Sequence, residues 1–296
     1  MMPIRPLFSD FIEIMENEPM RKHTSFKIGG NAEVLIRPKN TEELIHIWKT
    51  CSEKEIPLTV LGDGTNVLVS DNGISGVTVL TNRMDGIKTD GSRITASAGI
   101  RLAKLAEEAA KAGLNGLAFA SGIPGTVGGA VYMNAGAYGY DISSFCETVT
   151  VLTDSGVTVI PSEEMGFGYR KSKIQQGGML VLEAVFKLEQ GDTTKIREEM
   201  ADLNNRRRAT QPLDFPSAGS TFKRPDGYFA GKLIQDSGLK GYSIGGAQVS
   251  EKHAGFIINK GNAAAKDVMA LIEHVRREVH EKFGVWLEPE IRILGG

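Results

Sequence analysis

A glycine turn between two strands constrains the fold of this 296-residue chain more than any other feature. In the stretch VLGDGTNVLVS, residues 60–70, the turn Gly62-Asp63-Gly64-Thr65-Asn66 is followed by Val67-Leu68-Val69, which has the apolar, β-branched pattern of a strand. A dinucleotide fingerprint of the Rossmann type requires a helix after the turn, so that the pyrophosphate meets the helix N-terminus. The stretch therefore argues against a Rossmann site and raises the question of which ligand such a loop binds.

A second glycine-rich segment, SGIPGTVGGA at residues 121–130, has the same character. Glycine permits positive φ angles and lets a ligand approach the backbone, where successive N–H groups can hold an anion. Thr126 is predicted to cap a short helix, with Gly128 and Gly129 leaving the helix N-terminus open to a phosphate. Either segment alone is equally typical of an ordinary tight turn. Together they favour a diphosphate ligand.

The remaining pattern predicts three regions, residues 1–82, 83–205 and 206–296. We expect a short helix over 10–17, then a small β-α-β-β-β unit whose helix is capped by Thr41. The second region has hairpins at 86–100 and 147–161, a helix over 101–113 and a strand over 179–190. An amphipathic helix over 193–210 leads to the third region, an α+β unit with a helix over 264–282 and a final strand over 286–294.

Composition excludes several classes of protein. The 34 basic and 36 acidic residues nearly balance, which argues against a nucleic-acid or membrane-surface partner. Two cysteines cannot form a disulfide framework, and no Cys/His cluster indicates a metal. The first twenty residues contain no apolar run, so a cytoplasmic location is expected, and no protein partner is indicated. The run Arg206-Arg207-Arg208 is interpreted as cations that complement a helix C-terminus.

Eight motifs occur in an order that resembles the UDP-N-acetylenolpyruvoylglucosamine reductases. They are HTSFKIGG, LGDGTN, SGIPGTVGGAVYMNAGAYG, YRKS, AGSTFKRP, GYSIGGAQVS, HAGFIIN and LEPEIRILG, from about His23 to Gly295. The resemblance implies an α+β fold: a two-part FAD-binding region of the vanillyl-alcohol-oxidase (PCMH) type plus a C-terminal α+β substrate domain. The short chain is similar to the class that lacks a loop with a substrate-capping tyrosine.

The resemblance also indicates which ligand the glycine loop binds, because it implies that both glycine segments bind FAD without a covalent bond. The implied cofactor residues are Gly62, Asp63, Gly64, Thr65, Asn66, Ser121, Gly122, Ile123, Pro124, Gly125, Thr126 and Gly129. NADPH is the implied hydride donor. The implied product is UDP-N-acetylmuramate, a peptidoglycan precursor, formed by reduction of an enolpyruvyl ether on UDP-N-acetylglucosamine.

Three catalytic residues follow from the same resemblance. Arg170 matches an arginine that meets the substrate carboxylate, Ser220 a proton donor, and Glu290 a third residue that holds or protonates the enolate. From the residues alone, a surface cation is the favoured interpretation of Arg170 and a turn serine that of Ser220, and only the resemblance favours the catalytic roles. Strand alternation places Glu288, Glu290 and Arg292 on one face, and Leu287, Ile291 and Ile293 on the other.

Weaker expectations concern the substrate. Tyr138 resembles a substrate-facing tyrosine, and Lys223, Arg224 and Gln235 are candidates for contacts with the uridine diphosphate. Longer relatives differ at Arg224, while His253 is assigned a structural role. Two alternatives stay open: an FAD-dependent oxidase or dehydrogenase of a small hydroxy substrate, and a non-catalytic protein that binds a nucleotide sugar.

Overall fold

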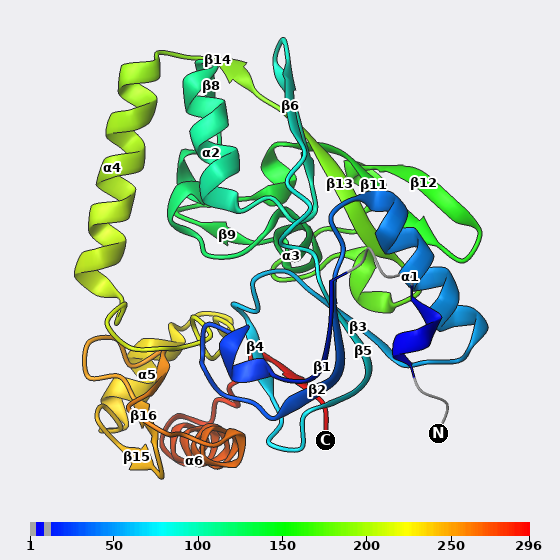
Figure 1. Cartoon of the computed structure of the whole chain (residues 1–296). Coiled ribbons are helices and arrows are strands. Elements are labelled where there is room, and N and C mark those ends of the chain that lie inside the picture. Colours follow the sequence, from blue (N-terminus) through cyan, green and yellow to red (C-terminus); the bar gives the residue numbers. More distant parts are fainter. Residues whose placement is uncertain (1–3, 9–12) are drawn as a thin grey trace. The chain divides into compact units, whose positions relative to one another are not determined.

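The computed structural model describes residues 4–8 and 13–296, and the chain divides into two compact units (Figure 1). The first unit comprises the N-terminal part up to Met15, Leu35–Asp63 and Val77–Arg207; the second comprises Glu16–Val34, Gly64–Gly76 and Arg208–Gly296. The division passes through the glycine turn, so Gly62 and Asp63 belong to the first unit and Gly64, Thr65 and Asn66 to the second. The predicted three-region division stays a prediction.

An antiparallel sheet of five strands is the centre of the first unit. Its order is β12 (Gly156–Pro161), β11 (Cys146–Thr153), β13 (Leu180–Lys187), β7 (Arg93–Ser97) and β6 (Ile87–Asp90). Both predicted hairpins are confirmed, because β6 pairs with β7 around Gly91 and β11 pairs with β12. The helices α2 (Leu102–Lys111) and α3 (Val127–Met133) contribute to the same core as the sheet.

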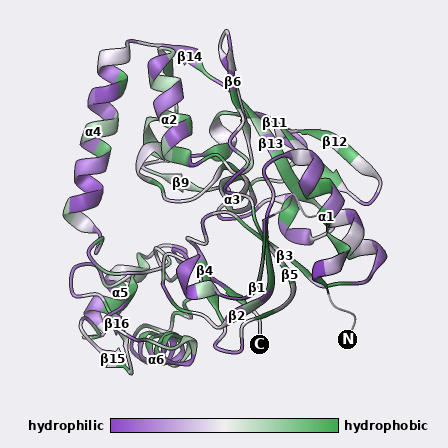
Figure 2. Ribbon diagram, in the orientation of Figure 1, coloured by the Kyte–Doolittle hydropathy of each residue, from purple (hydrophilic) through white to green (hydrophobic). Residues whose placement is uncertain are grey.

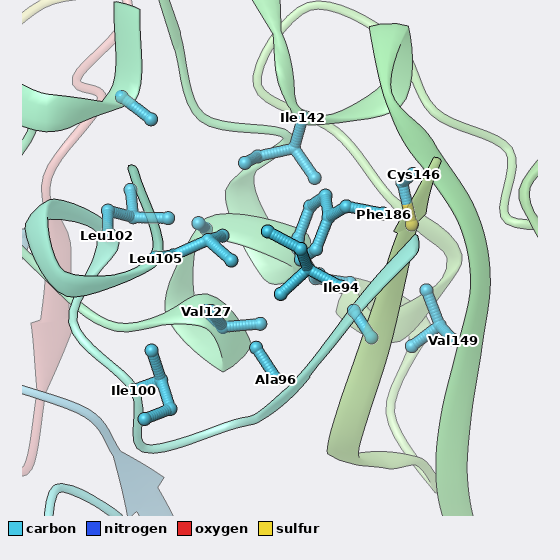
Figure 3. Close-up of a cluster of buried hydrophobic side chains, with 14 of the residues drawn as sticks. Ile94, Ala96, Ile100, Leu102, Leu105, Val127, Ile142, Cys146, Val149 and Phe186 are labelled. Atoms are coloured by element: carbon cyan, nitrogen blue, oxygen red, sulfur yellow. The ribbon is translucent and has the colours of Figure 1, made fainter. Parts of the chain in front are cut away.

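The core of the first unit is built from the inward alternation of these strands and one face of each helix. Leu105 of α2, Val127 of α3, and Ile94 and Phe186 of the sheet gather in one cluster of buried side chains (Figure 3). Cys146 joins this cluster at its edge, and Cys51 is also buried as a free thiol. Burial raises the pKa of Cys146 to about 12 and that of Cys51 to about 11, so both thiols stay protonated.

A four-stranded sheet has the order β1 (Glu13–Pro19), β2 (Asn31–Arg37), β5 (Ile74–Leu80) and β3 (Leu58–Leu61), with β3 parallel to β5. The helix α1 (Thr41–Glu53) follows β2 as predicted, and it buries Leu44, Ile47 and Cys51. Its N-cap is Asn40, whose side chain accepts the Glu43 N–H, so the assignment of Thr41 as cap was wrong. The predicted helix over 10–17 was also wrong for residues 13–17, which lie in β1; residues 10–12 lie outside the described residues.

Smaller elements complete the first unit. Two-residue strands pair as β8 (Leu114–Asn115) with β14 (Glu189–Gln190) and β9 (Gly136–Ala137) with β10 (Tyr140–Asp141). The helix α4 (Thr193–Thr210) is mostly hydrophilic (Figure 2); Met200 and Leu203 pack against the core, and Ile196 is buried. Short 3₁₀ turns lie at Arg5–Leu7, Ala118–Gly122, Ile142–Ser144, Ser162–Glu164 and Lys173–Gln176.

The second unit packs the long helix α6 (Ala265–Phe283) against a three-stranded sheet and a shorter helix. The sheet has the order β15 (Ser243–Ile244), β16 (Ala247–Val249) and β17 (Ile257–Asn259), and the shorter helix is α5 (Ala230–Asp236). Val268, Leu271, Ile272, Val275 and Val279 form the buried face of α6, as their spacing predicts. A 3₁₀ turn lies at Met20–Lys22.

The last part of the chain is extended, but its strand is shorter than predicted. The strand β18 (Arg292–Leu294) pairs in parallel with β4 (Val67–Val69), the strand that follows the glycine turn. Leu287 and Ile291 are buried as the alternation predicts. Ile293 is 47 % exposed, so it does not share the burial of Leu287 and Ile291, with which strand alternation had grouped it.

Candidate active site

The two glycine segments meet inside the first unit, at Gly62 and Thr126. A Cβ atom built on Gly62 would lie only 2.1 Å from Thr126 Oγ1, so only glycine allows this approach. Arg101, at the start of α2, forms a bridge with Thr126 and therefore lies beside the same contact. The fold thus brings together two segments that are more than fifty residues apart in the sequence.

The Asp63 carboxylate accepts hydrogen bonds from two side chains of the protein. Arg101 Nε donates to Asp63 Oδ2 at 2.8 Å, and Asn82 Nδ2 donates to Asp63 Oδ1 at 3.3 Å. Asn82 in turn accepts from Arg37, which also pairs with Glu13. A carboxylate engaged in this way leaves the backbone of the loop, rather than the Asp63 side chain, as the group suited to an anionic ligand.

Thr126 precedes α3, as predicted, but backbone N–H groups at the start of the helix are already hydrogen-bonded within the protein. The N–H groups of Val127 and Gly128 donate to the carbonyls of Ile100 and Ala98, each at 2.8 Å. The expectation that Gly128 leaves this N-terminus free for a phosphate was therefore wrong, because the preceding strand's loop supplies acceptors. Thr126 Oγ1, by contrast, is buried and has no hydrogen-bond partner among the described residues. An orphaned buried hydroxyl beside a cradle that a Cβ would fill suits a bound cofactor.

A small pocket borders the second glycine segment. It is lined by Phe119, Gly122, Ile123, Tyr138, Leu203, Asn204 and Arg207. Asn204 donates to Ser121 Oγ at 3.0 Å, and the Tyr138 hydroxyl donates to the Leu203 carbonyl at 2.9 Å. The C-terminal half of α4 therefore holds both the predicted cofactor segment and the predicted substrate-facing tyrosine. Tyr138 has a left-handed backbone conformation, with φ of 57°.

Arg207 lines this pocket, which sequence reasoning did not predict. The arginine run was interpreted as cations at a helix end, whereas Arg207 is half-buried in this pocket, and burial lowers the pKa of its guanidinium. The other two members of the run, Arg206 and Arg208, are exposed. Helical spacing separates neighbouring residues by about 100°, so a consecutive run places its members on different faces. Only the packing of α4 decides which one faces inward.

Arg170 belongs to a tight turn of the first unit. Gly168 and Lys171 exchange both backbone hydrogen bonds, at 3.1 Å each, and Arg170 has φ of 55° at the tip. Its Nη2 donates to the Gly136 carbonyl at 3.3 Å, and its carbonyl accepts from Gln175 at 3.0 Å. The guanidinium carbon lies 5.1 Å from the centre of the Tyr169 ring. These contacts hold a half-buried cation beside β9.

Ser220 and Glu290 lie on neighbouring segments of the second unit. The Glu290 N–H donates to the Thr221 carbonyl at 2.8 Å, so the residue after Ser220 is bonded to Glu290 directly. Asn66, from the glycine turn, donates through its side chain to the Glu290 carbonyl at 3.2 Å and accepts the Arg292 N–H at 2.9 Å. The second unit therefore brings one end of the turn, the predicted proton donor and the predicted acid together.

Three further candidates lie on the surface of the second unit. Lys223 pairs with Glu288, and Arg224 is stacked 4.0 Å from the centre of the Phe229 ring. Gln235 is exposed on α5. Their predicted roles with the uridine diphosphate stay predictions. Among the described residues, no group of three or more histidine, cysteine or acidic side chains could hold a metal ion. No helix in the described ranges is long and apolar enough to cross a membrane.

Known proteins match this chain over nearly its whole length. Residues 32–160 match the family described as FAD binding domain, and residues 211–294 match the family described as UDP-N-acetylenolpyruvoylglucosamine reductase, C-terminal domain. The UDP-N-acetylenolpyruvoylglucosamine reductase of Caldanaerobacter subterraneus subsp. tengcongensis is 52% identical over 280 residues, covering 94% of this chain and 93% of the relative. The enzyme of that name from Clostridium botulinum is 50% identical over 292 residues, covering 97% and 95%.

A solved structure agrees with the sequence relatives. The crystal structure of UDP-N-acetylenolpyruvylglucosamine reductase from Thermus caldophilus superposes with a TM-score of 0.81 at 36% identity, covering 96% of this chain and 99% of that one. The fold and the paired glycine segments therefore define a flavoprotein with an FAD-binding domain of the vanillyl-alcohol-oxidase type and a separate C-terminal domain. The chain belongs to the UDP-N-acetylenolpyruvoylglucosamine reductase family, the FAD-dependent oxidoreductases of peptidoglycan precursor synthesis.

Proposed function

We propose that this protein uses NADPH to reduce the enolpyruvyl ether of UDP-N-acetylglucosamine enolpyruvate, and that Arg170, Ser220 and Glu290 serve the substrate half of the reaction. The proposal rests on the family and on the matching of these residues to its motifs. Within the second unit, it is supported by the hydrogen bond that joins the Glu290 N–H to the residue after Ser220. We also propose Lys223, Arg224, Gln235 and Tyr138 as contacts of the substrate, and a cytoplasmic location.

The cofactor would be held by the two glycine segments. The backbone of Gly62, Gly64 and Gly125 would supply N–H groups, and the orphaned Thr126 hydroxyl would supply a buried polar group. FAD, when bound, supplies hydride transfer between NADPH and the substrate. Because Asp63 is engaged by Arg101 and Asn82, its carboxylate is neutralised where it would otherwise repel a diphosphate.

The chain's own residues act on the charge that develops in the substrate. When hydride adds to the methylene carbon, negative charge builds on the adjacent carbon and its carboxylate. Arg170 keeps its charge and can offer two parallel donors to that carboxylate. The Ser220 hydroxyl gives its proton to the adjacent carbon, since an enolate is a strong enough base to take it. Glu290, as a protonated carboxyl, holds or protonates the enolate together with Arg170.

The decisive experiment separates the two halves of the reaction by stopped-flow absorbance. In a Ser220→Ala variant, NADPH should still bleach the flavin at the wild-type rate, because that step needs no proton from Ser220. Reoxidation by the enolpyruvyl substrate should slow by about 10²- to 10⁴-fold, the usual effect of losing a general acid. A matched control is Ser237→Ala, whose hydroxyl donates to the Leu233 carbonyl on α5; it should leave both halves unchanged.

Two results would contradict the proposal. Full turnover in Ser220→Ala would remove the proton-donor role, and a wild-type protein whose flavin is not reoxidised by the enolpyruvyl substrate would remove the reaction itself. The preference for NADPH over NADH is tested by the same stopped-flow measurement, in which NADPH should reduce the flavin faster than NADH does.

A further inference from the structure

Thr221 uses every polar group it has to join three segments of the second unit. Its N–H donates to the Gly255 carbonyl at 2.8 Å, and its carbonyl accepts the Glu290 N–H at 2.8 Å. Its side-chain Oγ1 accepts the Ile257 N–H at 3.0 Å. The residue is only 2 % exposed, so these bonds form in a dry environment where each lost partner is costly.

The bonds of Thr221 continue along the chain on both sides. Phe222 bridges to Pro289, and the Lys223 N–H donates to the Glu288 carbonyl at 2.8 Å. Ser217 bridges to Ile258, so the segment 217–223 is connected by isolated bridges both to β17 and to residues 288–290. Of the residues in this segment, Thr221 is bonded to both neighbours at once.

The position of Ser220 depends on Thr221, the residue that follows it, because the residue that precedes it is a glycine. Gly219 has φ of 78°, a left-handed conformation that favours glycine, and a Cβ built on it would meet no non-neighbouring atom within 4 Å, so no close packing from the described residues holds the chain at that position. On the opposite side of the hydroxyl stands the loop of Gly255. A Cβ built on Gly255 would lie 3.5 Å from Ser220 Oγ and 3.0 Å from His253 Cε1.

We propose that Thr221 is the positioning residue for the proton transfer: its hydroxyl fixes the Ser220 segment between β17 and Glu290, and so sets where the Ser220 proton is delivered. This inference rests on the proposed function. This role requires no contact between Thr221 and the substrate. It acts through its neighbours: it fixes the position of the Ser220 hydroxyl relative to the segment that carries Glu290.

The test replaces Thr221 with valine, which keeps the shape and removes the acceptor for the Ile257 N–H. We expect reduction of the flavin by NADPH to be unchanged and reoxidation by the enolpyruvyl substrate to slow by about 10- to 100-fold, as for a misplaced catalytic group. Thr221→Ser restores an acceptor oxygen and should recover most of the lost rate. Hydrogen exchange at the Ile257 amide should be faster in the valine variant and close to wild type in the serine variant.

Thr78→Val is the matched control. Thr78 is equally buried, but its hydroxyl has no hydrogen-bond partner among the described residues, so the same substitution removes no contact. Both half-reactions should stay at the wild-type rate. If Thr221→Val proves too unstable to purify, Gly255→Ala tests the same arrangement, because the new methyl pushes the loop against His253; it should also slow only the reoxidation.

The outcomes separate this inference from the proposed function. Wild-type reoxidation that fails removes the proposed function and this inference with it. Wild-type reoxidation that succeeds, together with an unchanged rate in Thr221→Val despite faster exchange at Ile257, overturns the positioning role alone. Equal slowing of both half-reactions in Thr221→Val, or no recovery in Thr221→Ser, would also overturn it, because it would indicate general damage.

Discussion

His253 illustrates how a single side chain can fix a loop. Its Nδ1 accepts the Gly255 N–H at 3.1 Å, and its ring meets Phe256 edge-on with centroids 5.0 Å apart. Burial lowers the pKa of the imidazole, with a smaller contribution from the positive charge of Lys240. The lowered pKa favours the uncharged imidazole, and the contacts suit the structural role predicted for His253.

A half-buried histidine with a lowered pKa makes the stability of the protein depend on pH. The unfolded chain takes up a proton near the ordinary pKa of 6.5, whereas the folded chain resists it, so the free energy of unfolding should fall as pH drops through that value. His253→Asn keeps an acceptor for Gly255 and cannot titrate, so its loss of stability between about pH 7.5 and about pH 5 should be smaller than that of the wild type.

Urea unfolding at both pH values measures this difference. An equally steep loss of stability in wild type and His253→Asn would contradict the role given to His253.

Among the elements, α1 shows how a helix boundary is chosen between two suitable residues. Asn40 and Thr41 both have side chains typical of N-caps, so residue type does not decide between them. In the fold, Asn40 accepts the Glu43 N–H at 2.9 Å, and Glu43 accepts the Lys39 N–H at 2.8 Å. This reciprocal pair satisfies two backbone donors that would otherwise be unpaired at the helix start.

Replacing Asn40 with alanine should therefore destabilise the protein, by about 1 kcal/mol, through the loss of the cap. Thr41→Ala, at the first helical residue, should change the free energy of unfolding by less than about 0.5 kcal/mol. Equilibrium denaturation of both variants compares them directly. A larger effect at Thr41 than at Asn40 would show that the cap lies where the sequence pattern placed it.

At the scale of the whole molecule, two separate hydrophobic cores hold the two units. The first contains Leu105 and the second contains Leu271, and the clusters share no residue. Both leucines are fully buried. The second cluster is assembled from parts of the chain as distant as Phe26 and Ile291, so the order of the sequence does not map onto the order of the cores.

Leu105→Ala and Leu271→Ala should each lower the free energy of unfolding by about 2–5 kcal/mol, because each removes contacts and leaves a cavity. Since the clusters share no side chain, the double variant should equal the sum of the single variants within about 0.5 kcal/mol. Scanning calorimetry of the three variants checks this. A coupling above about 1 kcal/mol would show that the two cores respond as one.

Local patterns in the sequence determined much of this protein: the strands on either side of the glycine turn, both hairpins, the buried face of α6, and the order of motifs that identifies the family. Hydrophobic period and turn residues report backbone conformation over a few residues, so such features are readable without a fold. Tertiary structure alone decided that Gly62 meets Thr126, that Ala98 occupies the Gly128 N–H, that Arg207 faces inward and that Thr221 joins Ser220 to Glu290. Each of these depends on segments distant in the chain, whose pairing is set by the packing of the whole unit rather than by any local preference.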